Sequence, residues 1–240
     1  AALSGKEIPN QPPRGYMGDP VAIKEPTGVS FRRQAGANVL VIGQQEEGAM
    51  ALFASSIVSL AAQSSAARFY VLDGSPADSP LASVMPRVKD AVGDRVNLVE
   101  YRAAEETIAQ LAAELERRQS EGGANPPPIF LLIYGLQRYR GLRKSEDAGF
   151  SFNSSDEEKK PQADKQFADL LRDGPAAGMH VVAWCDTSAA LDRTLDRGAI
   201  RNVKPALEAR TLVEIAALVA YFMQRDHPVR RIVITRIAGS

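Results

Sequence analysis

The stretch NVLVIGQQEEGAM, residues 38–50, decides the fold of this chain. Residues 38–42 are a compact apolar run that stops at Gly43, as a strand buried in a parallel sheet does. From Glu46 onward the apolar residues fall at helical spacing, which predicts an amphipathic helix over residues 46–63. A buried strand that turns directly into a helix is a building unit of an α/β sheet.

The turn between this strand and this helix carries two glycines with the spacing of the phosphate-binding loop GxxxxGK(S/T). In that motif, backbone N–H groups and the helix dipole hold the phosphates, the lysine reaches the outer phosphates, and the hydroxyl binds magnesium. Here Ala49 takes the lysine position and Met50 the hydroxyl position, so neither can supply its group. The candidate nucleotide-binding positions of this degenerate loop are Gly43, Gln44, Gln45, Glu46, Glu47, Gly48, Ala49 and Met50.

Glu46 and Glu47 oppose the binding of a nucleotide at the start of this helix. Two carboxylates at a helix N-terminus complement the macrodipole themselves, and they would repel an incoming triphosphate. Taken alone, the two glycines indicate a plain strand-to-helix turn more than a phosphate-binding loop.

The exchange of strand and helix continues along the chain. Further strands are predicted at residues 69–72, 96–99, 129–133 and 181–184, and further helices at residues 80–92, 103–119 and 164–173. Regular alternation of this kind is typical of a parallel sheet that helices cover on both faces. The sequence therefore predicts a three-layer α/β sandwich with a mostly parallel sheet.

Two segments stand outside this pattern. Residues 1–19 are rich in proline and glycine and are predicted to be an arm or linker, ahead of a domain over residues 20–240 that opens with a short strand at 21–23. Residues 137–162 are polar and too long for an ordinary connection, so they are predicted to be a flexible or functional loop. The chain starts without a methionine, and we expect it to be a piece of a longer polypeptide.

Several stretches resemble the FtsK/SpoIIIE family of DNA translocases. The segments GDPV (18–21), NVLVIG (38–43) and a long helix that ends in SLA (59–61) resemble the entry to the motor domain. FYVLD (69–73) is similar to the next strand of the EccC-type ATPases of type VII secretion, and AAGMHVV (176–182) is similar to the entry to the family's polar sensor strand. The resemblance covers about residues 18–200 and implies a RecA/FtsK-like P-loop NTPase fold.

The resemblance also implies where active members would carry their catalytic groups. Residues 129–133 resemble the Walker B strand, after which the family has an aspartate for magnesium and a glutamate that orients water. This sequence has Tyr134 and Gly135 at those positions. The sensor position falls next to Trp184, at Cys185 and Asp186, where the family usually has Thr-Gln-Arg.

The tail departs from the family after Arg201. A helix is predicted at residues 211–224 and a final strand at 229–237, where the family would have apolar strands and a serine-aspartate motif. Residues 204–240 are therefore predicted to form an atypical C-terminal part.

The joint alteration of all three motifs implies an inactive module, of the kind that several multi-module FtsK-like proteins carry beside active ones. The predicted function is a non-catalytic, degenerate ATPase module that packs on or regulates active modules of the same polypeptide or of neighbouring subunits. No catalytic residue, cofactor or metal is expected in it, whereas active members use ATP and magnesium. Two alternatives stay open: an active ATP-dependent DNA translocase domain with unusual motifs, and a domain that has kept the fold and recognises protein or peptide.

Composition limits the partners and the compartment. Lysine plus arginine and aspartate plus glutamate both number 29, so the chain as a whole does not attract nucleic acid. The one cysteine excludes an internal disulfide and a cysteine-based zinc site, and it suits a reducing cytoplasm. No apolar run approaches the roughly 20 residues that span a bilayer.

A basic cluster near the predicted Walker B strand is the candidate for a DNA contact. It consists of Arg138, Arg140, Arg143 and Lys144, interleaved with one tyrosine. These side chains could touch DNA phosphate, or they could form a solvated loop balanced by the acids at residues 156–158.

Three polar positions at strand ends have a structural interpretation beside a catalytic one. Cys185 could be a nucleophile with His180 as its base, but a separation of five residues on one strand places the two side chains on opposite faces. Asp73 lies where α/β ligands bind, yet Asp-Gly-Ser-Pro is also a good turn. The pair Asp186-Thr187 equally predicts a helix N-cap.

Overall fold

The computed structural model describes residues 11–18, 27–121, 125–144, 163–195 and 204–207 of the chain. In these ranges the centre is a six-stranded sheet in which every pair of neighbouring strands is parallel. In spatial order the strands are β5 (Val96–Val99), β4 (Arg68–Asp73), β6 (Ile129–Tyr134), β7 (Met179–Cys185), β3 (Val39–Ile42) and β8 (Lys204–Leu207).

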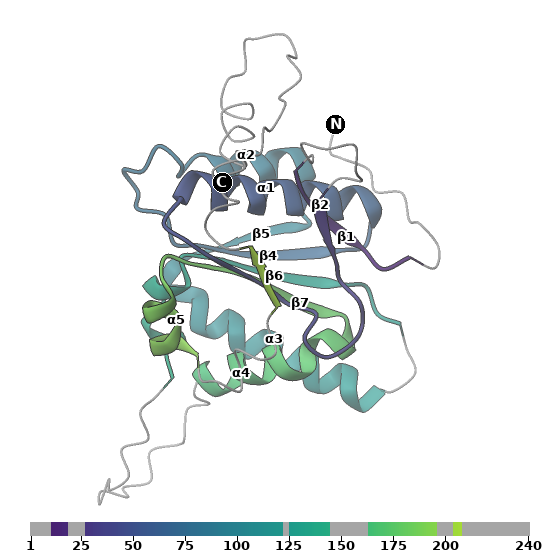
Figure 1. Cartoon of the computed structure of the whole chain (residues 1–240). Coiled ribbons are helices and arrows are strands. Elements are labelled where there is room, and N and C mark those ends of the chain that lie inside the picture. The colour runs from purple at the N-terminus through teal and green to yellow at the C-terminus, as the bar shows by residue number, and fades with distance from the viewer. Residues whose placement is uncertain (1–10, 19–26, 122–124, 145–162, 196–203, 208–240) are drawn as a thin grey trace, which may run out of the picture.

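Helices cover both faces of this sheet (Figure 1). One face carries α1 (Glu46–Gln63) and α2 (Val84–Val92), and the other carries α3 (Ala104–Glu121) and α4 (Ala163–Asp173). A short helix, α5 (Ser188–Thr194), follows β7. The predicted three-layer α/β sandwich with a parallel sheet is therefore confirmed.

Two buried clusters, one on each side of the sheet, form the core. Successive residues of a strand point to opposite faces, so Val39 and Val41 pack with α1 while Leu40 packs with the cluster of α3 and α4. The largest side chains buried on the α1 side of β6 and β7 are Tyr134 and Trp184. Because these two close the carboxyl ends of their strands, the core extends to the edge of the sheet where an α/β ligand would bind.

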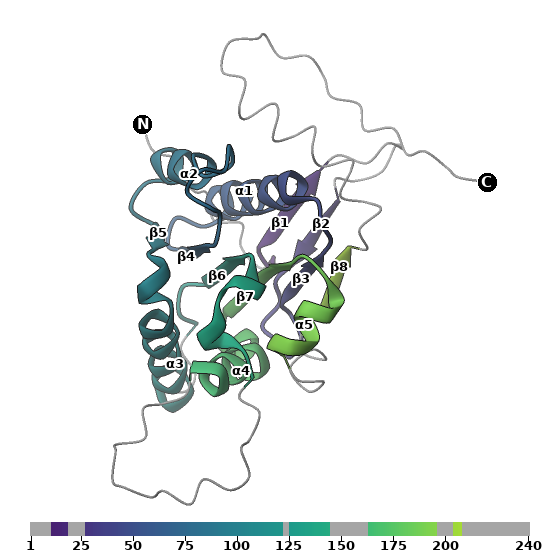
Figure 2. The same ribbon diagram turned by 90° about the vertical axis from the view of Figure 1, so that its left-hand side faces the viewer.

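A small antiparallel sheet of β1 (Arg14–Gly18) and β2 (Thr27–Ser30) lies beside α1 (Figure 2). Of the predicted arm over residues 1–19, the structure describes residues 11–18, and residues 14–18 of these form the strand β1. A row of polar side chains on α1 holds β1 in place. Gln63 Oε1 accepts a hydrogen bond from the Arg14 N–H at 3.0 Å, and Ser59 Oγ accepts one from the Tyr16 N–H at 3.0 Å.

The main boundaries agree with the sequence pattern. The helix predicted at 46–63 and the strand predicted at 96–99 match α1 and β5, and the other predicted elements differ by a few residues at their ends. The largest difference is at α2, which begins at Val84, because residues 80–83 form turns ahead of it. The predictions at residues 21–23, 211–224 and 229–237 lie outside the described residues, and the division into arm, domain and atypical C-terminal part remains a prediction.

The first part of the predicted flexible loop over residues 137–162 is folded. The turn η2 (Leu136–Arg138) is followed by η3 (Arg140–Leu142), and both Tyr139 and Leu142 are buried. These two side chains anchor residues 137–144 on the core. A functional role for the segment remains a prediction. Residues 145–162 lie outside the described part of the chain.

Candidate functional site

The β3–α1 turn is the part of the structure that corresponds to the phosphate-binding loop. Only residues 43–45 separate the strand from the helix, because α1 already begins at Glu46. Gly48 consequently lies in the first turn of α1, and the N–H of Ala49 donates to the Gln45 carbonyl at 3.0 Å. The side chains of Ala49 and Met50 are fully buried in the core. In a phosphate-binding loop the N–H at the position of Ala49 would be presented to the phosphate. Here it is part of the hydrogen bonding of the helix instead.

Two aromatic side chains cover the inner side of this turn. Tyr134 and Trp184 are partners in the β6–β7 register, and their rings stack with centroids 4.6 Å apart. The Tyr134 hydroxyl donates to the backbone carbonyl of Glu46 at 3.1 Å, and Trp184 Nε1–H donates to the Gly43 carbonyl at 2.9 Å. Burial, followed by the Glu46 carboxylate, raises the pKa of Tyr134 well above its usual value, so the phenol stays a neutral donor. The predicted motif position Tyr134 on β6, and Trp184 next to the predicted sensor position on β7, are thus joined to the turn by their own side chains.

Arg138 reaches across the top of the same turn. Gly135 adopts a left-handed conformation with φ +80°, which a side chain would disfavour, and η2 follows directly. From η2, Arg138 Nη2 forms an ion pair of 2.7 Å with Glu46 Oε1, and Nη1 donates to the Gly74 carbonyl at 2.5 Å. The guanidinium also lies over the Trp184 ring, 6.0 Å from its centroid.

Gly74 allows this closure at the end of β4. Its N–H donates to the Tyr134 carbonyl at 2.9 Å, and a Cβ atom at this position would lie only 2.6 Å from that oxygen. The neighbouring Asp73 accepts a hydrogen bond from the Ser75 N–H through Oδ1 at 2.9 Å, which agrees with the turn interpretation of this residue. The carboxyl ends of β3, β4, β6 and β7 are therefore tied together by Arg138, Tyr134 and Trp184.

The basic cluster predicted from the sequence is divided by this arrangement. Arg138 is half-buried and turned towards Glu46, whereas Arg140, Arg143 and Lys144 are exposed. Arg143 Nη2 donates to the Gln137 carbonyl at 2.7 Å. A contact of these three exposed side chains with DNA remains a prediction. Arg138 is not part of this exposed group, because it pairs with Glu46.

The residues at the predicted sensor position have structural roles. Cys185 is buried, and its burial raises the pKa of the thiol, so the thiol form prevails. Thr187 caps α5, because its Oγ1 accepts a hydrogen bond from the Ala190 N–H at 3.2 Å. His180 lies on the opposite face of β7 from Cys185, between Phe31 and Phe130, so the two cannot form a nucleophile and base pair. Across the described ranges, no group of three or more histidine, cysteine, aspartate or glutamate side chains could hold a metal ion.

Sequence reasoning placed the turn and both strand ends, but it missed the contacts that join them. The interaction of Arg138 with Glu46 spans 92 residues of the chain, and that of Trp184 with Gly43 spans 141. One signal was visible: a glycine, Gly135, follows a buried strand and precedes an arginine by three residues. Only the strand order and the β6–β7 register show which turn that arginine reaches.

Solved structures with a similar fold include two that are described as ATPases and one of a conjugation coupling protein. The chain is similar to EccC (ATPases 2 and 3) of Thermomonospora curvata in complex with a signal sequence peptide, at 18% identity and a TM-score of 0.53, over 84% of this chain and 37% of that one. It is similar to EssC (ATPases 2 and 3) of Geobacillus thermodenitrificans, at 16% identity and a TM-score of 0.53, over 83% and 35% of the two chains. The third is the pCW3 conjugation coupling protein TcpA in its monomer form with ATPγS, at 15% identity and a TM-score of 0.56, over 89% and 60%.

The fold is therefore that of a P-loop ATPase domain, of the kind found in EccC, EssC and TcpA. The chain spans little more than a third of the length of the EccC and EssC structures. No protein-family model matches the sequence, and no curated protein does. Among the described residues, no helix is long and apolar enough to cross a membrane.

The ion pair between Arg138 and Glu46 gives a first test of this geometry. We expect Glu46→Gln to lower the free energy of unfolding by about 1 kcal/mol, since it removes both an ion pair and a favourable charge at a helix N-terminus. Glu47→Gln is the matched control, since it removes only the second of these and is expected to cost about 0.3 kcal/mol. Urea denaturation at low and high salt measures both, and the difference should shrink in high salt. Equal costs for the two variants would contradict the ion pair.

Proposed function

We propose that this chain is a non-catalytic ATPase-like module of a larger FtsK/SpoIIIE-like protein. The observation that carries the proposal is the closure of the β3–α1 turn by the chain's own side chains. Arg138 pairs with the Glu46 carboxylate, while Tyr134 and Trp184 donate hydrogen bonds to backbone carbonyls of the turn. In an active member these places would serve a nucleotide, a magnesium ion and an attacking water.

The chemistry of phosphoryl transfer supports the same proposal. Catalysis of this reaction consists almost entirely of positioning and of neutralising the charge on the phosphate oxygens. Ala49 and Met50 offer neither a cation nor a hydroxyl, and Tyr134 and Gly135 offer no carboxylate for magnesium or water. A triphosphate that arrived at the turn would have to break the ion pair of Arg138 and would then meet the carboxylates of Glu46 and Glu47.

The partners in this proposal are other ATPase modules of the same polypeptide or of neighbouring subunits, in the cytoplasm. The support is that the similar structures of EccC and EssC are each described as carrying ATPases 2 and 3, so such modules occur next to one another there. EccC was solved with a signal sequence peptide and TcpA with ATPγS, which gives peptide and nucleotide as the two ligands to test against this chain. The spacing of Gly43 and Gly48 is the one feature that favours the alternative of an active translocase domain.

The fluorescence of Trp184 provides a test of nucleotide binding. Trp184 is the only tryptophan, and it lies in the closed turn, so its fluorescence reports directly on any ligand that enters. We expect no saturable change in this fluorescence with ATP and magnesium, and no steady-state phosphate release above background. A saturable change, or phosphate release that a substitution at Gly48 abolishes, would overturn the proposal in favour of the active alternative.

A further inference from the structure

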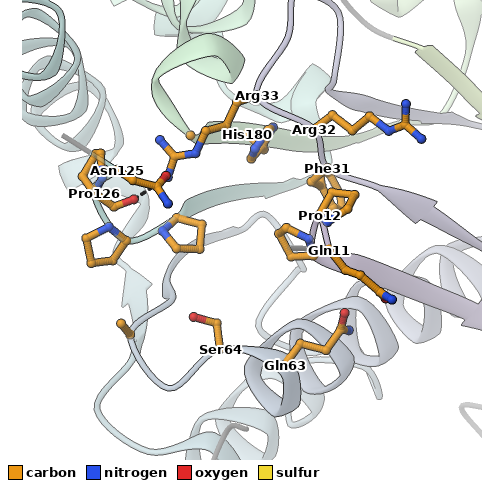
Figure 3. A pocket seen from close by; sticks show the side chains of 15 residues that line it. Gln11, Pro12, Phe31, Arg32, Arg33, Gln63, Ser64, Asn125, Pro126 and His180 are labelled. Carbon is orange, nitrogen blue, oxygen red and sulfur yellow. Dashed lines mark hydrogen bonds between the residues drawn. The ribbon is translucent and has the colours of Figure 1, made fainter. Parts of the chain in front are cut away.

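A cavity lies at the amino ends of the strands, at the edge of the sheet opposite the candidate site. Figure 3 shows its lining. Its volume is about 700 Å³. It is bounded by Ala66, Pro128 and Gly178, which precede β4, β6 and β7 within two residues. Figure 3 shows Gln63 and Ser64 at the end of α1 on one side and Arg32, Arg33 and His180 on the opposite side.

The charge of this cavity is one-sided. Arg32 and Arg33 line it, and among the described residues of its lining there is no aspartate or glutamate. Arg32 is exposed, and no hydrogen bond or ion pair joins its guanidinium to any described residue. Arg33 donates to the Pro126 carbonyl and packs against Gly178, where an added Cβ would lie 2.6 Å from the guanidinium carbon. A negatively charged ligand would therefore find one unpaired cation here and a second cation held in place by the backbone.

The walls of the cavity suit a peptide more than a nucleotide. Five prolines provide rigid aliphatic surfaces, and the amide side chains of Gln11 and Asn125 can each both donate and accept, as backbone groups require. Two rings belong to the described lining residues, Phe31 and His180. Both are buried and packed on Phe130, so neither is exposed to stack on a base.

The helix ends at this edge also disfavour several negative charges at once. α1 ends at Gln63 beside the cavity, and the C-terminus of a helix carries the negative end of its dipole. Arg95 already donates to the carbonyls of Ala61 and Ser64 at 3.0 and 2.7 Å, so it is committed to that helix end. A triphosphate would meet this negative end, whereas single carboxylates spaced along a peptide can lie against Arg32 and Arg33 on the other wall.

We propose that this cavity binds an extended acidic peptide segment of a partner protein. The segment would lie along the proline surfaces, exchange hydrogen bonds with Gln11 and Asn125, and place a carboxylate at Arg32. The proposal concerns the amino edge of the sheet and does not depend on whether the β3–α1 turn at the carboxyl edge binds a nucleotide.

Fluorescence anisotropy on the whole 240-residue chain tests this proposal. The probe is a short fluorescein-labelled peptide of alternating glutamate and leucine, compared with peptides in which glutamine or lysine replaces glutamate. We expect the glutamate peptide to bind, the glutamine peptide to bind at least about fivefold more weakly, and the lysine peptide not to bind, on the scale of one exposed ion pair.

Two variants, each with a matched control, locate the binding. Arg32→Glu should weaken the glutamate peptide by about tenfold, because attraction is replaced by repulsion. Its control, Arg87→Glu, changes an exposed arginine on α2, away from the cavity, and should have no effect. Ala66→Trp fills part of the cavity from an exposed position and should abolish binding, whereas Ala62→Trp on the exposed side of α1 should not.

The outcomes are separable from those of the nucleotide test. Equal affinity for the three peptides, no binding of the glutamate peptide, or no effect of Arg32→Glu and Ala66→Trp would overturn the proposal. Displacement of the peptide by ATP, with ATP binding weakened by Arg32→Glu, would also overturn it in favour of a nucleotide at this edge. Binding of a peptide or of ATP in this cavity is expected to leave the fluorescence of Trp184 unchanged, because Trp184 lies near the carboxyl end of β7.

Discussion

Replacing Trp184 with alanine is expected to lower the free energy of unfolding by about 3–5 kcal/mol, the range for a large aromatic residue truncated in a core. Trp184 is fully buried, its ring stacks on Tyr134, and its Nε1–H donates to the Gly43 carbonyl. The alanine variant loses all three interactions and leaves a cavity under the guanidinium of Arg138. The loss measures how tightly the candidate site is closed by its own side chains.

Two comparisons separate the contributions. Trp184→Phe keeps an aromatic ring but leaves the Gly43 carbonyl without its donor, so an intermediate loss of about 1–3 kcal/mol is expected. Tyr101→Ala is the matched control, because Tyr101 also stacks on a tyrosine, with centroids 5.1 Å apart, yet is 55% exposed. Its loss should stay below about 1.5 kcal/mol.

Urea denaturation followed by circular dichroism measures these losses, because the fluorescence probe is absent from both Trp184 variants. A cost below about 1 kcal/mol for Trp184→Ala would mean that the turn is not packed as described. The proposal of a closed, non-catalytic module would then lose the observation on which it depends.

The layered fold followed from local patterns in the sequence. The helix α1 and the strand β5 begin and end where the periodicity of apolar residues changes, because such periodicity depends only on neighbouring residues. The alternation of strands and helices then indicated the parallel sheet, since a parallel strand needs a crossover connection. The order of the strands did not follow from this reasoning, because β7 inserts between β3 and β6 through contacts distant in the sequence.

The strand β1 shows why a segment with little local signal can still be ordered. Residues 14–18 include two glycines and follow two prolines, which indicates a linker when only neighbouring residues are considered. Their backbone is instead paired with side chains of α1, including Ser55 Oγ, which donates to the Tyr16 carbonyl at 2.8 Å. The signal lay elsewhere in the chain: Ser55, Ser59 and Gln63 repeat every four residues along a helix that is otherwise largely apolar.

The candidate site was predicted as a set of positions, and its chemistry came from the tertiary structure. The sequence shows that Glu46 and Glu47 are negative, but it could not show that Arg138 compensates the first and leaves the second to solvent. Arg138 reaches Glu46 because Gly135 turns the chain back over β6. Its guanidinium also reaches the Gly74 carbonyl, because β6 and β4 are neighbours in the sheet.

The stability of the protein is expected to fall between about pH 6.5 and pH 4 because of His180. Burial, and beyond it the positive charge of Arg33, lowers the pKa of His180 to about 4, although a hydrogen bond of its Nδ1 with the Ala37 carbonyl acts in the opposite direction. In the unfolded chain the pKa of a histidine is about 6.5. Below pH 6.5 His180 is therefore protonated in the unfolded chain but stays neutral in the folded protein, and the free energy of unfolding decreases.

The decrease should reach roughly 3 kcal/mol at pH 4, since a difference of one pKa unit corresponds to about 1.4 kcal/mol. Below pH 4 the folded protein also binds the proton, and this contribution no longer changes. Urea denaturation at a series of pH values measures it, with His180→Gln expected to lose the slope that the parent shows in this window. The chain has two histidines, and His227→Gln is the control that should retain the slope. If the parent and His180→Gln have the same pH dependence, the imidazole is not held neutral between Phe31 and Phe130, and the packing beside the amino-edge cavity differs from the one described.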